Sequence, residues 1–268
     1  MNAQQEILRQ PVLSHGTLAD RITEAGCGLA VLAGIAAALS GLGTKWGWWY
    51  FMSGFSLLKV AAISGGIGAV LSLVGGVMAK HEHRGSIFFI AAAGILVGLL
   101  TFGIPMSWAY RAGKMPMIHD ITTDMTNPPQ FKAIMQFRNS AENPSTYGGQ
   151  KTAAQQASAY PDIRPLMLPM TRQTAFDRAF LTAKNMGWRI VDSSRREGRI
   201  EAIATTFWFG FKDDIIVRVT PVVDGSKVDV RSTSRVGLSD IGTNAKRIRT
   251  FLKKMNEPGE GSSESPGY

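Results

Sequence analysis

The chain has 268 residues, with 29 Lys and Arg against 20 Asp and Glu, and a single cysteine, Cys27. One cysteine excludes an intrachain disulfide, and the sequence contains no phosphate-binding loop, dinucleotide fingerprint or CxxC motif. Residues 1–110 hold six basic and four acidic side chains, and residues 111–268 hold the other 23 and 16. The first part is therefore suited to lipid and the second to water.

Three apolar stretches follow one another near the N-terminus. Residues 26–43 carry no charge over 18 positions, which is just long enough for a helix to cross a bilayer core of ~30 Å. Residues 46–78 are interrupted only by Lys59, and residues 85–110 carry no charge. We predict an N-terminal tail over 1–25, a transmembrane region over 26–110, an aromatic belt at 46–51 and spans at about 26–43, 55–78 and 85–110.

Small residues recur in these spans at helical spacing. Gly94 and Gly98 form a GxxxG motif, and Gly68, Ser72 and Gly76 form a similar ladder. Such spacing lets helix backbones approach closely. Two interpretations are open, packing of the three spans of one chain on each other, which we favour, and an oligomer formed through the same faces.

The distribution of basic residues predicts the topology. Three spans place the N-terminus and the second loop on one side of the bilayer and the C-terminal part on the other. Basic residues are slightly more numerous on the first side, which favours a cytoplasmic N-terminus and an extracytoplasmic C-terminal domain. The residues compared are Arg9, Arg21, Lys80 and Arg84 against Lys45, Arg111 and Lys114.

Residues 111–255 are predicted to form a soluble domain. Its first part, 111–162, is rich in turn residues, with a strand or a short helix at 131–137. Residues 162–168 read as an extended edge segment, because proline is tolerated there. An amphipathic helix follows at 174–187, with Thr174 and Asp177 as a capping box and Gly187 at its end.

Four strands and a second helix complete the predicted domain. "WRIVDSS" turns into "RIEAIATTFWF", and "DDIIVRVTPVV" turns at Asp224-Gly225 into "SKVDVRSTSR". The closing helix begins at Ser239 or Asp240, and residues 256–268 read as a disordered tail. The predicted fold is α+β, with two helices on a four-stranded or slightly larger antiparallel sheet. The predicted buried stripe of the closing helix is Ile241, Ala245, Ile248, Leu252 and Met255.

Five stretches resemble one known family. They are "IHDITTD" (118–124), "NPPQF" (127–131), "AYPDI" (159–163), "GRIEAIATTFWFGFKDDIIVRV" (198–219) and "VDVRSTSRVGLSDIGTNAKRI" (228–248). In this order they are similar to the domain of unknown function family 1499, over roughly residues 115–255. The resemblance implies a bacterial protein whose domain follows hydrophobic spans, and it modestly supports an extracytoplasmic domain. It implies no enzyme activity and carries over no catalytic residue. We also expect no cofactor.

The segment after the third span holds the first candidate site. His119, Asp120 and Asp124 are residue types that bind metals, yet a hard cation needs more oxygen ligands and zinc more His or Cys. The favoured interpretation is a structural lead-in to the domain, shaped by side chain-to-backbone hydrogen bonds. Asp213 and Asp214 are adjacent, so in a strand they face opposite ways, and we expect them to cap the turn after Gly210.

Basic residues near the closing helix form the second candidate. Guanidinium groups suit carboxylates and phosphates, and a helix N-terminus favours anions. The alternative is a solvated basic face with internal ion pairs. The residues predicted to line an anion-binding pocket are Arg231, Arg235, Asp240, Asn244 and Arg247.

These observations favour a membrane-anchored, non-catalytic binding or scaffolding protein of the bacterial inner membrane, with its domain in the periplasm. Besides the lipid bilayer, we expect an anionic lipid, an envelope precursor or an acidic protein as partner, and no nucleic acid. Two alternatives are open. One is an enzyme acting on a membrane-associated substrate through His119 and a carboxylate, and the other is a structural subunit of a membrane complex.

Overall fold

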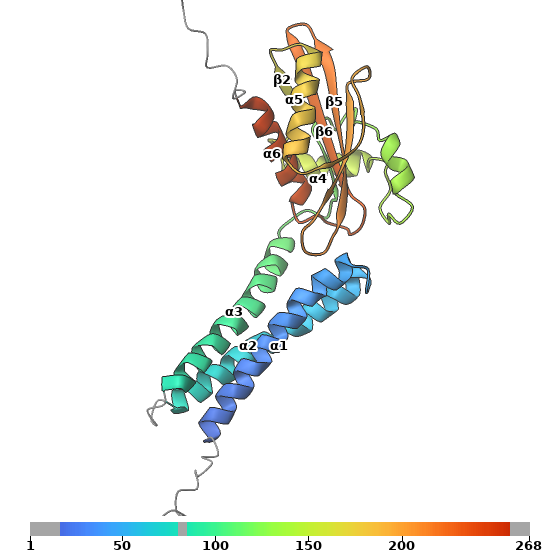
Figure 1. The fold of residues 1–268 in the computed structure, drawn as a ribbon. Coiled ribbons are helices and arrows are strands. Elements are labelled where there is room, and N and C mark those ends of the chain that lie inside the picture. Colours follow the sequence, from blue (N-terminus) through green and yellow to red (C-terminus); the bar gives the residue numbers. More distant parts are fainter. Residues whose placement is uncertain (1–16, 80–84, 258–268) are drawn as a thin grey trace, which may run out of the picture. The chain divides into compact units, whose positions relative to one another are not determined.

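The computed structural model describes residues 17–79 and 85–257. The chain divides into two compact units, Met1–Ala109 and Tyr110–Tyr268, each with its own packing (Figure 1). The predicted tails lie mostly outside the described residues, with 1–16 missing from the first and 258–268 from the second.

Three long helices make up the first unit: α1 (Leu18–Lys45), α2 (Phe51–Ala79) and α3 (Gly85–Ala112). Each is long and apolar enough to cross a membrane, so this unit has the make-up of a multi-pass membrane anchor. Helix α1 begins eight residues before the predicted span, because Thr17 and Asp20 form a capping box. Residues 18–25 are therefore helix and not tail.

Small residues bring the three helices close together. A Cβ added at Gly68 of α2 would lie 2.7 Å from the backbone nitrogen of Ala30 in α1. A Cβ at Gly98 of α3 would lie 2.8 Å from the Cβ of Ala69 in α2, so only glycine fits there. The small-residue faces thus pack within one chain, and association of copies through them stays a prediction.

The predicted aromatic belt is the connection between α1 and α2. Trp46–Tyr50 form a turn, and α2 begins directly after it at Phe51, four residues before the predicted span. The indole Nε1 of Trp49 donates to the carbonyl of Ser40 at 3.1 Å, and its ring lies against Gly43. The belt is thereby fixed to the end of α1.

The second unit is built on one antiparallel sheet. Its strands run in the order β1–β6–β5–β4–β3, and the short β2 also pairs with β6, beyond the end of β1. The Asp224-Gly225 hairpin joins β5 and β6 as predicted. The strands are β1 (Asp120–Thr122), β2 (Leu166–Leu168), β3 (Arg189–Ser194), β4 (Arg199–Thr205), β5 (Lys212–Val222) and β6 (Gly225–Ser234).

Helices α5 (Arg172–Asn185) and α6 (Thr243–Asn256) cover one face of this sheet (Figure 1). Alternate residues of the strands meet them in a single apolar core, which includes Ile215, Val217 and Val230. In that core Trp188 stacks on Phe251 with 5.1 Å between the ring centres. The mixed α+β fold, with two helices on an antiparallel sheet, is as the sequence predicts.

Both helices begin elsewhere than predicted. Thr171 caps α5 by accepting a hydrogen bond from the backbone N–H of Thr174, so Thr174 lies inside the helix. Helix α6 begins at Thr243, after Gly242 in the left-handed conformation. Ile241 therefore precedes the helix and is exposed, and Phe251 takes a place in the buried stripe.

The stretch before β2 has more structure than its turn residues indicate. Residues 133–137 form a short 3-10 helix, η2 (Ala133–Phe137), and α4 (Gly149–Ala159) follows. Gln156 of α4 is buried, donates to the carbonyl of Thr122 at 2.6 Å and accepts from its N–H at 3.0 Å. The amide of Gln156 thus satisfies the open edge of β1 as a further strand would.

Candidate functional site

The sheet face turned away from α5 and α6 carries buried charged residues. Residues paired in register share a face, so Asp120, Thr233 and Asp214 lie side by side, and Arg231 lies in the neighbouring row. The segment 123–147 supplies the groups that contact them. We call this surface the polar face, and its buried residues include Asp120, Glu201, Asp214, Asp229, Arg231 and Thr233.

Arg231 is enclosed at the centre of the polar face. Its guanidinium donates two hydrogen bonds to the Asp120 carboxylate, of 2.9 and 2.7 Å. The rings of Phe131 and Tyr147 lie 5.0 and 5.6 Å from it. Burial, reinforced by the Asp120 carboxylate, raises the pKa of Tyr147 to about 12. Arg231 also donates to the carbonyls of Pro129 and Ser145, at 3.1 and 2.7 Å.

Two guanidinium groups share a second buried carboxylate, that of Asp214. Arg235 donates to it through Nε at 3.0 Å and Nη2 at 2.7 Å. Arg138, from the loop after η2, binds the other oxygen of Asp214 and also donates to the carbonyl of Asn143. Asp214 is thus a buried acceptor for two cations, and it does not cap the turn after Gly210.

Asp213 lies on the opposite face, toward α6, as its adjacency to Asp214 predicts. Its carboxylate accepts from Arg247 at 2.6 Å. Beside this pair, Asn244 accepts from the hydroxyl of Ser232 at 2.6 Å and donates to the carbonyl of His119 at 2.9 Å. Arg247 and Asn244 therefore lie together and connect α6 to the sheet, whereas Arg231 and Arg235 lie on the polar face.

Asp240 holds the start of α6. Its carboxylate accepts from the backbone N–H groups of Gly242, at 3.1 Å, and of Asn244. Burial disfavours the ionised form and raises the pKa of Asp240 to about 6, although these two N–H groups offset part of that effect. Asp240 thus has a structural partner at the helix start and a pKa close to neutral.

The side chains of the three residues in the predicted lead-in have different partners. Asp120 binds Arg231, and the ring Nδ1 of His119 lies 3.5 Å from the hydroxyl of Thr233. Burial lowers the pKa of His119. Asp124 accepts from the N–H groups of Thr126 and Asn127, as in an Asx turn.

Asp124 also binds two cations, Arg218 at 3.1 Å and Lys227 at 3.3 Å. Burial alone would raise the pKa of Asp124, but the N–H of Asn127 and the Lys227 ammonium outweigh it and lower the pKa. Within residues 17–79 and 85–257, no three His, Cys, Asp or Glu side chains come together as a metal-binding group. His119, Asp120 and Asp124 thus bind neighbouring parts of the domain.

Two acidic residues of the polar face were not singled out from the sequence. Buried Glu201 accepts from the backbone N–H groups of Lys132, Ala133 and Ile134, at 3.0, 3.2 and 2.8 Å. Asp229 accepts from Arg218 at 2.8 Å. Both alternate with apolar residues along their strands. That pattern shows that they lie on the face opposite the apolar core. It does not show that another segment of the chain covers this face.

The chemistry of this arrangement is mainly structural. Each of the three predicted arginines is bound to a buried aspartate, and such carboxylates are poorly placed to act as general bases because guanidinium groups occupy their oxygens. A ligand anion there would have to displace a carboxylate from a buried pair, which is costly. The alternative of internal ion pairs thus describes how Arg231, Arg235 and Arg247 are bonded.

Exposed cations lie instead on the outer side of α6. Lys246, Lys253 and Lys254 are exposed, and no carboxylate of the described residues forms an ion pair with them. Arg249, on the same helix, is paired with Asp162 at 2.6 Å. Lys246 and Lys253 are seven residues apart, so they share one side of the helix. We call these three lysines the α6 basic surface.

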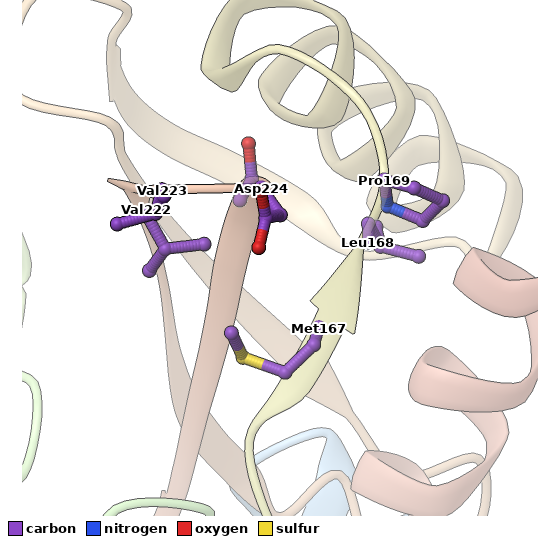
Figure 2. Close-up of a pocket in the computed structure, with 7 residues that line it drawn as sticks. Met167, Leu168, Pro169, Val222, Val223 and Asp224 are labelled. Carbon is purple, nitrogen blue, oxygen red and sulfur yellow. The ribbon is translucent and has the colours of Figure 1, made fainter.

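A shallow pocket lies at the end of the sheet that carries the β5–β6 hairpin. Figure 2 shows it between β2 and the hairpin. Its volume is about 450 Å³. Its lining is mostly apolar, with the Asp224 carboxylate as its one charged group. The lining residues are Met167, Leu168, Pro169, Val222, Val223, Asp224 and Ser226. None of the residues predicted from the sequence as site residues lines it.

The domain matches the model of one known family. The model of a family described as Protein of unknown function (DUF1499) matches residues 120–255, from the first residue of β1 to the last buried residue of α6. This match covers just over half of the chain. A comparison with curated proteins gives no match. The chain therefore belongs to the DUF1499 family, and three membrane-span helices precede its family domain.

Proposed function

We propose that this protein is a membrane-anchored, non-catalytic binding or scaffolding protein of the bacterial inner membrane, with its domain in the periplasm. The observation that carries the proposal is the bonding of the buried ionisable groups. Asp120, Asp213 and Asp214 are each bound to an arginine, and the ring of His119 lies beside the hydroxyl of Thr233. In such a domain these ionisable groups are occupied by partners within the chain.

An anionic partner would meet the α6 basic surface before it met the buried arginines. Lys246, Lys253 and Lys254 are exposed, and a lysine without a paired carboxylate attracts phosphate or carboxylate groups at little desolvation cost. The partner is an anionic lipid, an envelope precursor or an acidic protein. A binding role for Arg231, Arg235, Asp240, Asn244 and Arg247 stays a prediction, and Arg247 lies on α6 itself.

The test reverses the charge of this surface without disturbing the core. The full chain in detergent is titrated with a short-chain phosphatidylglycerol, a polyprenyl diphosphate and polyglutamate, one probe for each class of partner. We expect one probe to bind, and to bind more weakly to the Lys246→Glu/Lys253→Glu/Lys254→Glu variant. The control is Lys151→Glu, which reverses an exposed lysine on α4.

Two results would contradict the proposal. One is that none of the three probes binds the full chain, and the other is that charge reversal on α6 leaves the affinity of the bound probe unchanged. A cellular assay complements the titration, because the triple variant should reproduce the phenotype of a full deletion while the Lys151→Glu variant should not.

A further inference from the structure

One end of the sheet is where the chain enters the domain from α3. Residues 113–119 lead from α3 to β1, and seven residues span at most ~25 Å. The backbone N–H of Ser234 donates to the carbonyl of His119, and Ser234 pairs with Asp213. Thr205, the last residue of β4, pairs with Lys212. The β4–β5 turn therefore lies at the entry end of the sheet.

That turn is held by a hydrogen bond and by aromatic stacking, and it carries an exposed aromatic ring. The sequence predicts a continuous strand here, but β4 ends at Thr205 and residues 206–211 form a turn closed by the N–H of Thr206 on the carbonyl of Phe211. Phe209 is buried and stacks on Phe211 with 5.4 Å between ring centres. Phe207, in the same turn, is 85% exposed.

The loop that precedes α6 brings more apolar side chains to the same end. Leu238 is 72% exposed and Ile241 is 45% exposed. The loop is attached to the entry segment, because the hydroxyl of Ser239 donates to the carbonyl of Pro116 at 2.9 Å. Ile241 has a φ of 51°, an unfavourable conformation for a β-branched residue. The loop thus holds an isoleucine outward in a strained backbone.

The charge of the entry end complements an anionic lipid surface. Lys114 and Lys212 are exposed there, and Arg111 lies in the last turn of α3, from which the segment emerges. Glu142 is an exposed acidic residue at this end. Aromatic and large apolar side chains with neighbouring cations are typical of protein surfaces that lie on a bilayer.

We propose that the entry end of the domain docks on the bilayer surface, with Phe207, Leu238 and Ile241 reaching into the lipid interface. The short tether favours lipid as the occupant, because it keeps this end within reach of the bilayer that α3 crosses. The inference goes beyond the proposed function, since it requires only the membrane anchor and no ligand on α6. It also accounts for the exposure of three large apolar side chains at one end of the domain.

The opposite end of the sheet provides a matched control. Val223, in the β5–β6 hairpin, is fully exposed, as apolar as Leu238, and separated from the entry end by the length of β5. If exposure and apolarity alone drew side chains into lipid, Val223 would insert as readily as Phe207. Docking through the entry end predicts that it stays in water.

The experiment measures how deep each position lies. The full chain carrying Cys27→Ala receives one spin label at a time through Phe207→Cys, Leu238→Cys, Ile241→Cys or Val223→Cys. It is reconstituted in vesicles of phosphatidylethanolamine and phosphatidylglycerol. We expect oxygen to relax the labels at 207, 238 and 241 more than a water-soluble nickel chelate does, with the reverse at 223. Equal, water-like accessibility at all four positions would overturn the proposal.

A second measurement separates docking from an effect of the label. With the label at 241, Phe207→Ser should raise its accessibility to the nickel chelate, because the shared contact with lipid is weakened. Val223→Ser should leave it unchanged. If both serine variants leave the label at 241 in the same environment as the parent protein, the aromatic turn does not contribute to docking and the proposal fails. Neither readout depends on Lys246, Lys253 or Lys254.

Discussion

At the scale of single residues, the domain is organised by how it handles buried charge. Alternation along residues 225–234 predicts which side chains share a face. Val228 and Val230 face the core, and Arg231 points to the other face of the same strand. Alternation says nothing about whether that second face is covered. The cover comes from residues 123–147, about a hundred positions earlier, and its contacts depend on tertiary packing rather than on local pattern.

The Asp120–Arg231 pair gives the sharpest residue-scale prediction. Asp120→Asn leaves the guanidinium buried without its counter-charge, which typically costs about 3–5 kcal/mol. Hydrogen exchange of peptides from β6, measured on the full chain in detergent, should report a loss of opening free energy in that range. The control is Lys132→Ala, which removes an exposed ion pair with Glu197 and should have a much smaller effect, because water screens exposed pairs. Equal effects of the two substitutions would contradict a structural role for Arg231.

Asp240 predicts a pH dependence. Its pKa is about 6 in the fold and 3.8 as an unperturbed carboxyl, so the folded state holds the proton more tightly than the unfolded state. Ionisation therefore costs stability, and the cost is absent below about pH 3.8, grows as the pH rises and is complete above about 6. Relative to Asp240→Asn, the parent protein should lose stability from pH 4 to 6, by at most ~1.4 kcal/mol per pH unit.

The measurement is again hydrogen exchange of the full chain, here of peptides from α6, corrected for the intrinsic pH dependence of exchange. Asp240→Asn keeps an oxygen that accepts from the N–H groups at the start of α6, so the helix itself should persist. A difference between the two proteins that is constant from pH 4 to 6 would mean that Asp240 has an ordinary pKa in the fold.

At the scale of elements, the sequence predicts those whose pattern is strong. Three apolar runs become α1, α2 and α3, and Asp224-Gly225 becomes the tight turn between β5 and β6. Helix α4 was not predicted, because "GQKTAAQQASA" has alanine and glutamine where an amphipathic helix needs large apolar residues. Its anchor is Gln156, a polar residue whose partner lies 34 positions away.

The packing of α3 on α2 gives a prediction at this scale. Gly98→Ala would place a Cβ 2.8 Å from that of Ala69 and force the helices apart, so hydrogen exchange in the middle of α2 and α3 should become faster. Gly103→Ala is the matched control on the same helix, because no atom of the described residues lies within 4 Å of its added Cβ. Alanine there improves helix propensity and should leave exchange unchanged or slower. A similar response of both variants would argue against close packing at Gly98.

At the scale of the whole molecule, the uneven distribution of charge already predicts a division into a lipid-facing and a water-facing part. The structure divides the chain at Ala109 and Tyr110, at the end of the third apolar run. The family match covers residues 120–255 of the second part and leaves its activity open. An odd number of spans means that the N-terminus and the domain are on opposite sides of a bilayer, and which side holds the domain decides which anions it meets.

We predict that the domain is extracytoplasmic, because slightly more basic residues flank the N-terminal side of the spans than the other side. Alkaline phosphatase, which is active only outside the cytoplasm, is fused after residue 45, 79 or 257. Activity is expected after one span and after three, and its absence after two, with green fluorescent protein at the same positions giving the reverse. The 45 and 79 fusions calibrate each other, since they differ by one helix. Fluorescence of the 257 fusion with an inactive phosphatase would place the domain in the cytoplasm and would remove envelope precursors from its candidate partners.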